Sequence, residues 1–571
     1  MDRTAWIAVI LCVVGLVLWE LYLAQQTPRR PAPVNMPTQA SPVPTPAASL
    51  AASSLATVTT PKPEEAASSF PEKIETLGNS DVELHLTNRG GGIREAVLLK
   101  QVAEKGQRVI LNSPECAPIG AIIEQPSAPA LPEFTASSQS NSAVQFERTT
   151  PEQITTRKKF FFPPSTEKKD NFIIGLDVDL ENRGPKPYQT AGYFVALGSA
   201  APIHPKDYPS YTRLVWCIDG KAKGIDVGWF GGGSGFLGMG QRAARLFYEQ
   251  NIAGAEWVAV SDQFFTTLMA PLTAKANQVW GRRFDVTRAP DQKLLGIEGA
   301  LGMPGFRLQP GQTYSARFEI YAGPKLYHRL AQLPHNEAEI MDFGMFKIVC
   351  QFLLNFMNLL HSWLGNYAAA ILALTTIIKL VLWPIQNRAN RSMRQMSALS
   401  PKMQELREKY KDDPTRMNQE VMKLYKSYGI NPVGGCLPMV IQIPIFFGLF
   451  KMLGQAVELR NAKFLWVKDL SQPDTVGHLP FLGWPINIIP LCMAATQIWL
   501  MQMTPKTGDA TQRRVMMFTP LIFLFICYNF AAALALYYTT QNLFSILQFY
   551  QNKRQPMPTL EKVAPAGKRK R

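Results

Sequence analysis

The middle of the chain alternates apolar and polar residues. In the stretch GLDVDLEN, Leu176, Val178 and Leu180 fall on one face, and the stretch TYSARFEIYAG, which begins at Thr313, alternates in the same way. A period of two residues, interrupted by Gly and Pro, is typical of β strands that bury one face. We therefore expect a large, mostly β domain over residues 73–335.

Long apolar runs lie at the N-terminus and after residue 340. The first run, residues 5–23, is long enough to cross the hydrocarbon core of a bilayer. Only Asp2 and Arg3 precede it and no A-x-A site follows it, which favours an uncleaved anchor over residues 1–24 rather than a signal peptide. Residues 25–72 are rich in Pro, Ala and Ser, a composition that predicts an extended linker.

The C-terminal half predicts a membrane-embedded core over residues 340–552. Its first segment mixes apolar and polar positions as an interfacial helix does. The expected transmembrane helices are residues 367–385, 434–457, 480–503, 515–530 and 532–550. The expected fold is a membrane protein with an α-helical core of five transmembrane helices, an N-terminal anchor helix and a large all-β domain.

The distribution of charge orients these spans. Residues 386–432 carry ten Lys and Arg against five acidic residues, and the tail over residues 553–571 ends in GKRKR. By the positive-inside rule both segments are cytoplasmic, so both termini are cytoplasmic and the β domain faces outward. Arg29 and Arg30, just after the anchor, outnumber Arg3 before it and disagree with this orientation. We give more weight to the consensus of the downstream spans.

The basic loop between the first two core spans has helical periodicity. Apolar residues recur at three- and four-residue steps on each side of a break at Pro414, which predicts a helical hairpin over residues 397–428. A plain solvated hairpin and a docking arm both fit this pattern, and the excess of basic residues favours docking. The net charge of +16 fits anionic lipids or ribosomal partners better than DNA, since no DNA-recognition motif is present.

The sequence offers no convincing catalytic or cofactor site. Gly233, Gly235 and Gly238 match a dinucleotide fingerprint, but no βαβ pattern surrounds them, so we interpret the stretch as a glycine-rich loop. Cys116 and Cys217 share the β domain, which leaves a disulfide open if that domain is exported. The histidines are scattered without metal-ligand spacing, at His85, His204, His328, His335, His361 and His478. We expect neither an enzyme nor a metalloprotein, and no cofactor.

Polar residues inside the spans are the candidate functional residues. Thr376, Lys379 and Trp383 recur on one face of the first core helix, and the spans contain no Asp or Glu to pair with Lys379. Further candidates on other spans are Gln442, Gln497, Tyr538, Gln541 and Asn542. Together they predict a hydrated, positively charged groove, although each polar residue could instead join helices by hydrogen bonds. Lys379 could also snorkel to the cytoplasmic surface.

Three stretches carry a resemblance to a known family. NPVGGCLPMVIQIPIF (residues 431–446), LYYTTQN (residues 536–542) and the charge in IIKLVLWP resemble the YidC membrane-protein insertase family of Gram-negative bacteria. The resemblance implies a periplasmic β-supersandwich domain and an inner-membrane core that inserts and folds nascent inner-membrane proteins, alone or with the Sec translocon. It also implies that the basic hairpin and tail bind the ribosome and a targeting receptor.

Two positions depart from the family pattern. Lys379 stands where the family usually has arginine, and a lysine ammonium cannot form the planar fork of a guanidinium. NFAAAL (residues 529–534) replaces the usual FPSG, which leaves the shape of the last outward turn open.

Two other classes of protein fit the sequence less well than an insertase. A polytopic secondary transporter with an accessory periplasmic domain would be expected to carry a carboxylate or histidine relay in its spans, and none is visible. A glycan-binding receptor built on the β domain would leave the spans without a purpose.

Overall fold

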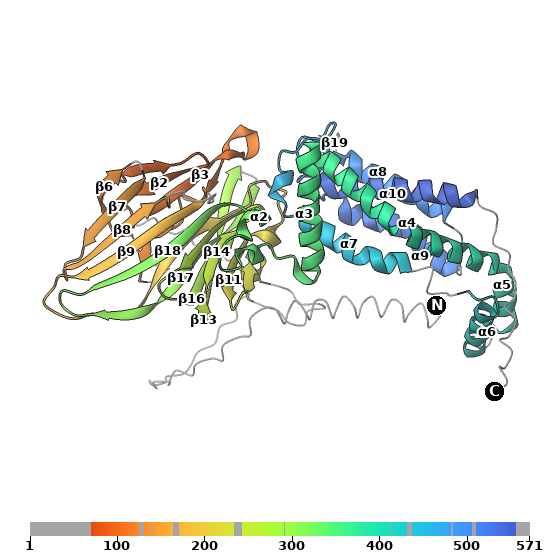
Figure 1. Cartoon of the computed structure of the whole chain (residues 1–571), viewed down its shortest axis with the longest axis horizontal. Coiled ribbons are helices and arrows are strands. Elements are labelled where there is room, and N and C mark those ends of the chain that lie inside the picture. The colour runs from red at the N-terminus through yellow and green to blue at the C-terminus, as the bar shows by residue number, and fades with distance from the viewer. Residues whose placement is uncertain are drawn as a thin grey trace, which may run out of the picture.

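The chain forms a β domain and a helical bundle that lie end to end (Figure 1). The structure, a computed structural model, describes residues 70–124, 131–140, 142–163, 171–232, 243–289, 292–411, 413–430, 437–480, 483–504 and 510–554. The predicted anchor, most of the predicted linker, the glycine-rich loop at Gly233–Gly238 and the tail after Arg554 lie outside the described residues.

The largest sheet of the β domain is antiparallel throughout, and it contains both strands that the alternation pattern predicted. Leu176 pairs with Phe318 and Val178 with Ala316 across neighbouring strands, and all four side chains are buried. The order across this sheet is β12 (Lys221–Asp226), β11 (Arg213–Ile218), β14 (Trp257–Ser261), β15 (Phe265–Pro271), β18 (Thr313–Pro324), β9 (Ile173–Asn182), β8 (Ile154–Phe161), β7 (Ala143–Thr149) and β6 (Thr135–Ser140). The prediction of a mostly β domain is confirmed.

Two smaller sheets complete the domain. One has the order β13 (Phe247–Ala255), β16 (Ala276–Ala289), β17 (Gln292–Leu308), β10 (Tyr188–Ala200) and β5 (Ile122–Ile123). The other has the order β1 (Ile74–Gly78), β2 (Val82–Thr87), β3 (Gly92–Val102) and β4 (Arg108–Leu111). Strand β10 packs over β14 and β15, so the first of these sheets faces the largest sheet and the domain core lies between them.

The β domain holds a fully buried lysine between two of its sheets. Lys158 on β8 is fully buried, and its ammonium donates to the backbone carbonyls of Gly90 at 2.6 Å, Gly91 at 2.9 Å and Gly120 at 2.9 Å. The ring of Phe134 lies 4.7 Å from the same nitrogen. The three glycines have positive φ, so their turns can bring carbonyls together around one cation. Lys158 therefore ties the β1–β4 sheet to the largest sheet.

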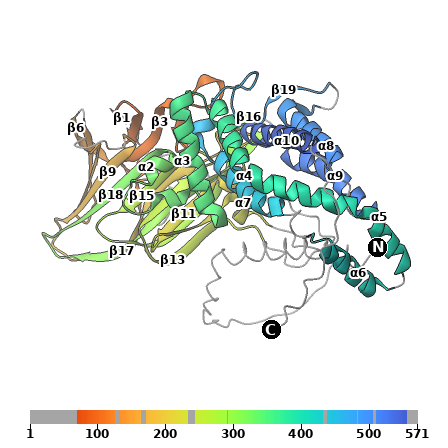
Figure 2. The ribbon, with the colours of Figure 1, turned by 45° about the vertical axis from the view of Figure 1, so that its right-hand side comes forward.

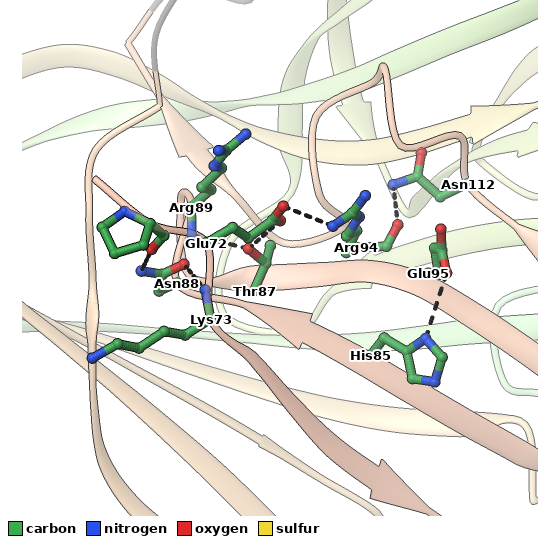
Figure 3. Close-up of polar contacts among 10 residues, drawn as sticks. Glu72, Lys73, His85, Thr87, Asn88, Arg89, Arg94, Glu95 and Asn112 are labelled. Atoms are coloured by element: carbon green, nitrogen blue, oxygen red, sulfur yellow. Dashed lines mark hydrogen bonds and ion pairs between the residues drawn. The ribbon is translucent and has the colours of Figure 1, made fainter. Parts of the chain in front are cut away.

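Polar contacts fix the point where the chain enters the β domain (Figure 3). The carboxylate of Glu72 accepts from Thr87 Oγ1 and from an Arg94 guanidinium nitrogen, each at 2.7 Å. Asn88 accepts from the backbone N–H of Lys73 and donates to the backbone carbonyl of Pro71. The segment before β1 is thereby held against β2 and β3.

The helical bundle extends away from the β domain (Figure 1). After the short α2 (Tyr327–Leu330), the helices are α3 (Lys347–Leu364), α4 (Tyr367–Ala398), α5 (Ser400–Lys409), α6 (Pro414–Ser427), α7 (Leu437–Leu453), α8 (Ile488–Met503), α9 (Ala510–Cys527) and α10 (Ala532–Lys553). Below, the end of the bundle next to the β domain is called the outer end, and the opposite end, where α5 and α6 lie, the inner end.

The predicted spans and the observed helices differ mainly at their ends; α9, for example, ends at Cys527 and not at residue 530. The predicted span 480–503 was wrong at its start, because a hairpin of β19 (Thr475–His478) and β20 (Pro485–Asn487) precedes α8. The span 434–457 was too long, because α7 ends at Leu453. The span 367–385 lies within α4, which continues through Pro384 to Ala398 beyond the end of the predicted span. Within the described residues, α4 is the one helix that is long and apolar enough to cross a membrane, and Val440–Leu453 and Ile488–Met503 are shorter apolar helices.

Helix α3 lies across the outer end of the bundle, as both views show (Figures 1 and 2). Its inward face packs on α4 and α7, while Ile348, Phe352 and Trp363 are exposed on its other face. This is the amphipathic pattern of a helix at a membrane surface. Asn358 on α3 donates to Glu458 Oε1 at 3.4 Å.

Two oxygen atoms of these side chains have no hydrogen-bond donor among the described residues. Glu458 Oε2 and Asn358 Oδ1 are buried and have no hydrogen-bond partner in the part of the chain that the structure describes. Burial raises the pKa of Glu458. A protonated Glu458 supplies the donor that the pair lacks, so a neutral acid–amide pair would tie α3 to the segment after α7.

The outer end of the bundle is fastened to the β domain by side chains from both. Gln263, before β15, donates to the backbone carbonyl of Gly454 at 2.7 Å. The guanidinium of Arg460 donates to the Val102 carbonyl at 3.0 Å and lies 5.1 Å from the ring of Phe264. These contacts fix the chain that leaves α7 against the β domain.

The last outward turn, whose shape the sequence left open, is short, and the alanines that follow it are buried. Phe530 packs between Phe450 of α7 and Tyr208 of the β domain. The backbone N–H groups of Ala532 and Ala533 donate to carbonyls of residues 472 and 470, which satisfies donors that a helix N-terminus leaves free. The alanines of NFAAAL allow this close approach of α10 to the preceding loop.

Lys158→Met should destabilise the β domain by roughly 3 kcal/mol or more, because it leaves three buried carbonyls without their donor. Thermal unfolding of the detergent-solubilised chain measures this effect. Lys159→Met is the matched control, since Lys159 is exposed and should change stability by less than about 0.5 kcal/mol. Equal stability of the two variants would contradict the structural role of Lys158.

The docking of α3 should weaken as the pH rises. The folded pKa of Glu458 lies above its unfolded value, so its contribution is fully present at low pH and is lost as the pH rises through the folded pKa. Hydrogen exchange of α3, corrected for the intrinsic pH dependence, should therefore accelerate as the pH rises through the folded pKa of Glu458. Glu458→Gln keeps a neutral partner for Asn358 and should remove this acceleration; an unchanged pH response in this variant would refute the acid–amide pair.

Candidate functional site: a polar groove between helices

One face of α10 carries a series of polar side chains. Gln541, Ser545, Gln548 and Asn552 recur at steps of four, three and four residues, so they lie along one side of the helix. All four are buried. Helix α10 packs on α4, α7 and α8, and the four polar side chains bond to partners on α4 and α7.

Lys379, the charge within the first core span, points to this face of α10. Its ammonium donates to Ser545 Oγ at 2.8 Å, and Ser545 in turn donates to the carbonyl of Gln541 at 3.0 Å. No carboxylate forms an ion pair with Lys379 among the described residues. The structure thus places a cation between α4 and α10 whose partner is a neutral hydroxyl.

Gln442 of α7 is the second residue at the centre of the bundle. Its amide nitrogen donates to Tyr537 OH at 3.0 Å and to Gln541 Oε1 at 3.1 Å. Gln442 and Lys379 line the same small cavity, together with Gln386, Gln548 and apolar residues. The volume of this cavity is about 10 Å³, which is room for about one water molecule. The groove is therefore nearly closed in this conformation.

The other predicted site residues are not among the residues that line this cavity. Asn542 donates to Thr496 Oγ1 at 3.2 Å and joins α10 to α8, while the neighbouring Gln497 is half-buried. Thr376 donates to a carbonyl of its own helix, that of Leu372. Trp383 contributes its backbone carbonyl, which accepts from Gln548 at 3.2 Å. Tyr538 packs in an aromatic cluster with Phe446 and Phe523.

Sequence reasoning missed several residues of this network. Tyr537, and not its neighbour Tyr538, bonds to Gln442. Asn387, Gln548 and Asn552 join α4 to α10 nearer the inner end. The signal for Gln548 and Asn552 was present, because they extend the spacing of Gln541 and Ser545 by two further helical steps.

Comparison with known proteins agrees with this architecture. The family model described as "YidC periplasmic domain" matches residues 76–356, and the one described as "60Kd inner membrane protein" matches residues 359–558. The Membrane protein insertase YidC of Syntrophus aciditrophicus is 30% identical over 583 residues, which cover 97% of this chain and 100% of that protein. The YidC of Syntrophobacter fumaroxidans is 37% identical over 298 residues, which cover 52% of this chain and 53% of that protein, so the match spans about half of that relative.

One solved structure among the matches is titled "Active YidC insertase crystal structure with the first transmembrane domain resolved". It is 18% identical, with a TM-score of 0.34, and the match covers 85% of this chain and 94% of that one.

The two matched regions and the described fold define an inner-membrane protein with a periplasmic domain that is mostly β-sheet. The chain belongs to the YidC family of membrane protein insertases. The resemblance that the sequence motifs indicated is confirmed.

The structure also answers the question about cysteines. Cys116 and Cys217 are both buried free thiols, so the disulfide that the sequence left open is absent from the described β domain. Among the described residues, no group of three or more His, Cys, Asp or Glu side chains could hold a metal ion.

Proposed function

We propose that this protein inserts nascent membrane proteins into the inner membrane by admitting a polar client segment between α4, α7 and α10. The observation that carries the proposal is Lys379, a cation that donates to Ser545 and lines a cavity with Gln442. A client carboxylate would give this ammonium the counter-charge that the helices do not supply.

The energies involved favour a cation, rather than side-chain amides alone, as the group that binds an acidic client tail. An acidic side chain at the centre of a bilayer costs about 2.5–3.5 kcal/mol on insertion scales. A single hydrogen bond between membrane helices contributes on average about 0.6 kcal/mol. One or two amides therefore cannot offset the cost of an acidic tail, whereas an ammonium that also lacks a counter-charge can. The hydrophobic segment of the client would then leave sideways into lipid, without nucleotide, metal or covalent chemistry.

The same proposal sets the orientation of the chain in the membrane. With the β domain in the periplasm, the inner end of the bundle is cytoplasmic, as are both termini. The hairpin of α5 and α6 has a small apolar core of its own that contains Leu399, Met403 and Tyr425, and it presents basic residues outside that core. This hairpin and the basic tail would bind the ribosome, a targeting receptor and anionic lipids, and the client could also arrive from the Sec translocon.

Lys379 variants test the groove. In a bacterium depleted of its insertase, Lys379→Arg should support insertion of a single-span client with an acidic tail. Lys379→Gln and Lys379→Glu should reduce it at least about tenfold, since losing roughly 1.4 kcal/mol of stabilisation changes a rate tenfold. Protease protection of the client tail measures insertion, with expression of each variant checked.

A client with an uncharged tail provides the control, because it should depend much less on the charge at residue 379. Equal insertion of the acidic client by all three variants would show that the ammonium is dispensable. The mechanism would then depend on the shape and hydration of the groove alone.

A further inference from the structure

The inner part of the α4–α10 contact contains side-chain amides that extend from Gln548, which lines the Lys379 cavity, toward the inner end of the bundle. Asn387 Oδ1 accepts from Gln548 Nε2 at 2.7 Å and from Asn552 Nδ2 at 3.2 Å. Arg394 donates to the backbone carbonyl of Asn552 at 2.7 Å. These contacts join the two helices between the Lys379 cavity and the inner end of the bundle.

Asn390 lies on the same side of α4, three residues after Asn387 and four before Arg394. Its side chain is 1% exposed, yet neither its amide oxygen nor its amide nitrogen has a hydrogen-bond partner among the described residues. Buried polar groups are nearly always hydrogen-bonded, so an amide with both groups unpaired calls for a ligand.

The length of α4 places these amides near the membrane surface. The helix has 32 residues and so extends about 48 Å, whereas the hydrocarbon core of a bilayer is about 30 Å thick. If Tyr367 marks the outer boundary, the helix leaves the hydrocarbon near Asn387. A polar chain that arrives from the inner end would therefore meet Asn387 and Asn390 before it meets Lys379.

We infer that Asn387 and Asn390 of α4, with Gln548 and Asn552 of α10, form an entrance subsite that binds the peptide backbone of the client's polar leading segment. The inference rests on the proposed function and adds the place where the client first binds.

The chemistry of side-chain amides suits this role. A primary amide offers one acceptor and two donor hydrogens, and a peptide bond offers one acceptor and one donor. A client backbone could therefore replace the contacts of Asn387 with equivalent ones, and it would add new contacts at Asn390. Such recognition does not depend on client sequence, because every peptide bond carries the same groups.

The distance between the two sites sets the register of the client. Asn390 follows Lys379 by eleven residues, which is about 16 Å along a helix. An extended chain covers this distance with about five residues. The client residue at Asn390 should thus lie about five positions from the acidic residue that reaches Lys379.

Disulfide cross-linking to a ribosome-arrested client tests this register. The full-length protein would carry Asn390→Cys, with the exposed Cys492 replaced by Ser, and single cysteines would be scanned along the polar tail of the client. Cross-linking should peak about five residues from the acidic residue. Val381→Cys is the matched control, because Val381 lies on the same helix with 68% of its surface exposed. Equal cross-linking at the two sites, or none at residue 390, would overturn the inference.

Asn390→Leu separates binding from a structural role. Leucine has the same number and branching of side-chain heavy atoms and no unpaired amide, so a purely structural role predicts unchanged or higher thermal stability and unchanged insertion. We expect stability to be kept and insertion of the polar-tailed client to fall several-fold. If Asn390→Leu inserts normally while Lys379→Gln fails, the entrance subsite is wrong and the groove stands; if both insert normally, both proposals fail.

Discussion

A polar group that leaves water inside a bilayer must find its hydrogen bonds within the protein, and here that requirement falls on α10. The ammonium of Lys379, the amide of Gln442 and the hydroxyl of Thr496 come from three different helices, and each bonds to a side chain on α10. The bundle is thus organised around one helix whose polar face is turned inward. The same arrangement keeps these groups paired in the interior of the bundle.

The periplasmic domain bears on this bundle through its outer end. Gln263 holds the residue after α7, Arg460 rests on Phe264, and Phe530 of the last turn packs on Tyr208. The two helices whose ends meet these contacts, α7 and α10, are the ones that supply Gln442 and its partners. The position of the β domain and the geometry of the groove are therefore linked through rigid helices.

Sequence patterns predicted the secondary structure correctly where neighbouring residues alone determine it. The alternation around Leu176 predicted a strand, and the presence of polar residues in apolar runs identified Lys379, Gln442 and Gln541 as candidates. Prediction failed where distant contacts decide. Trp484 and Pro485 look like the start of an apolar span, but pairing with β19 makes them part of a hairpin. The local sequence does not show which of Lys158 and Lys159 is buried. The three carbonyls that accept from Lys158 belong to turns elsewhere in the sequence.

The dependence of the bundle on α10 has a consequence for how the protein itself is made. Ser545 follows Lys379 by 166 residues, and α10 is the last described helix to be synthesised. At the usual bacterial rate of about 5–20 residues per second, α4 waits roughly 10–30 s for the side chain that accepts from its ammonium. During that interval Lys379 has to be accommodated by water, lipid headgroups or another protein. During its own synthesis, the first core helix of this chain thus has an unpaired polar group in the membrane. We propose that the finished protein solves this same problem for its clients.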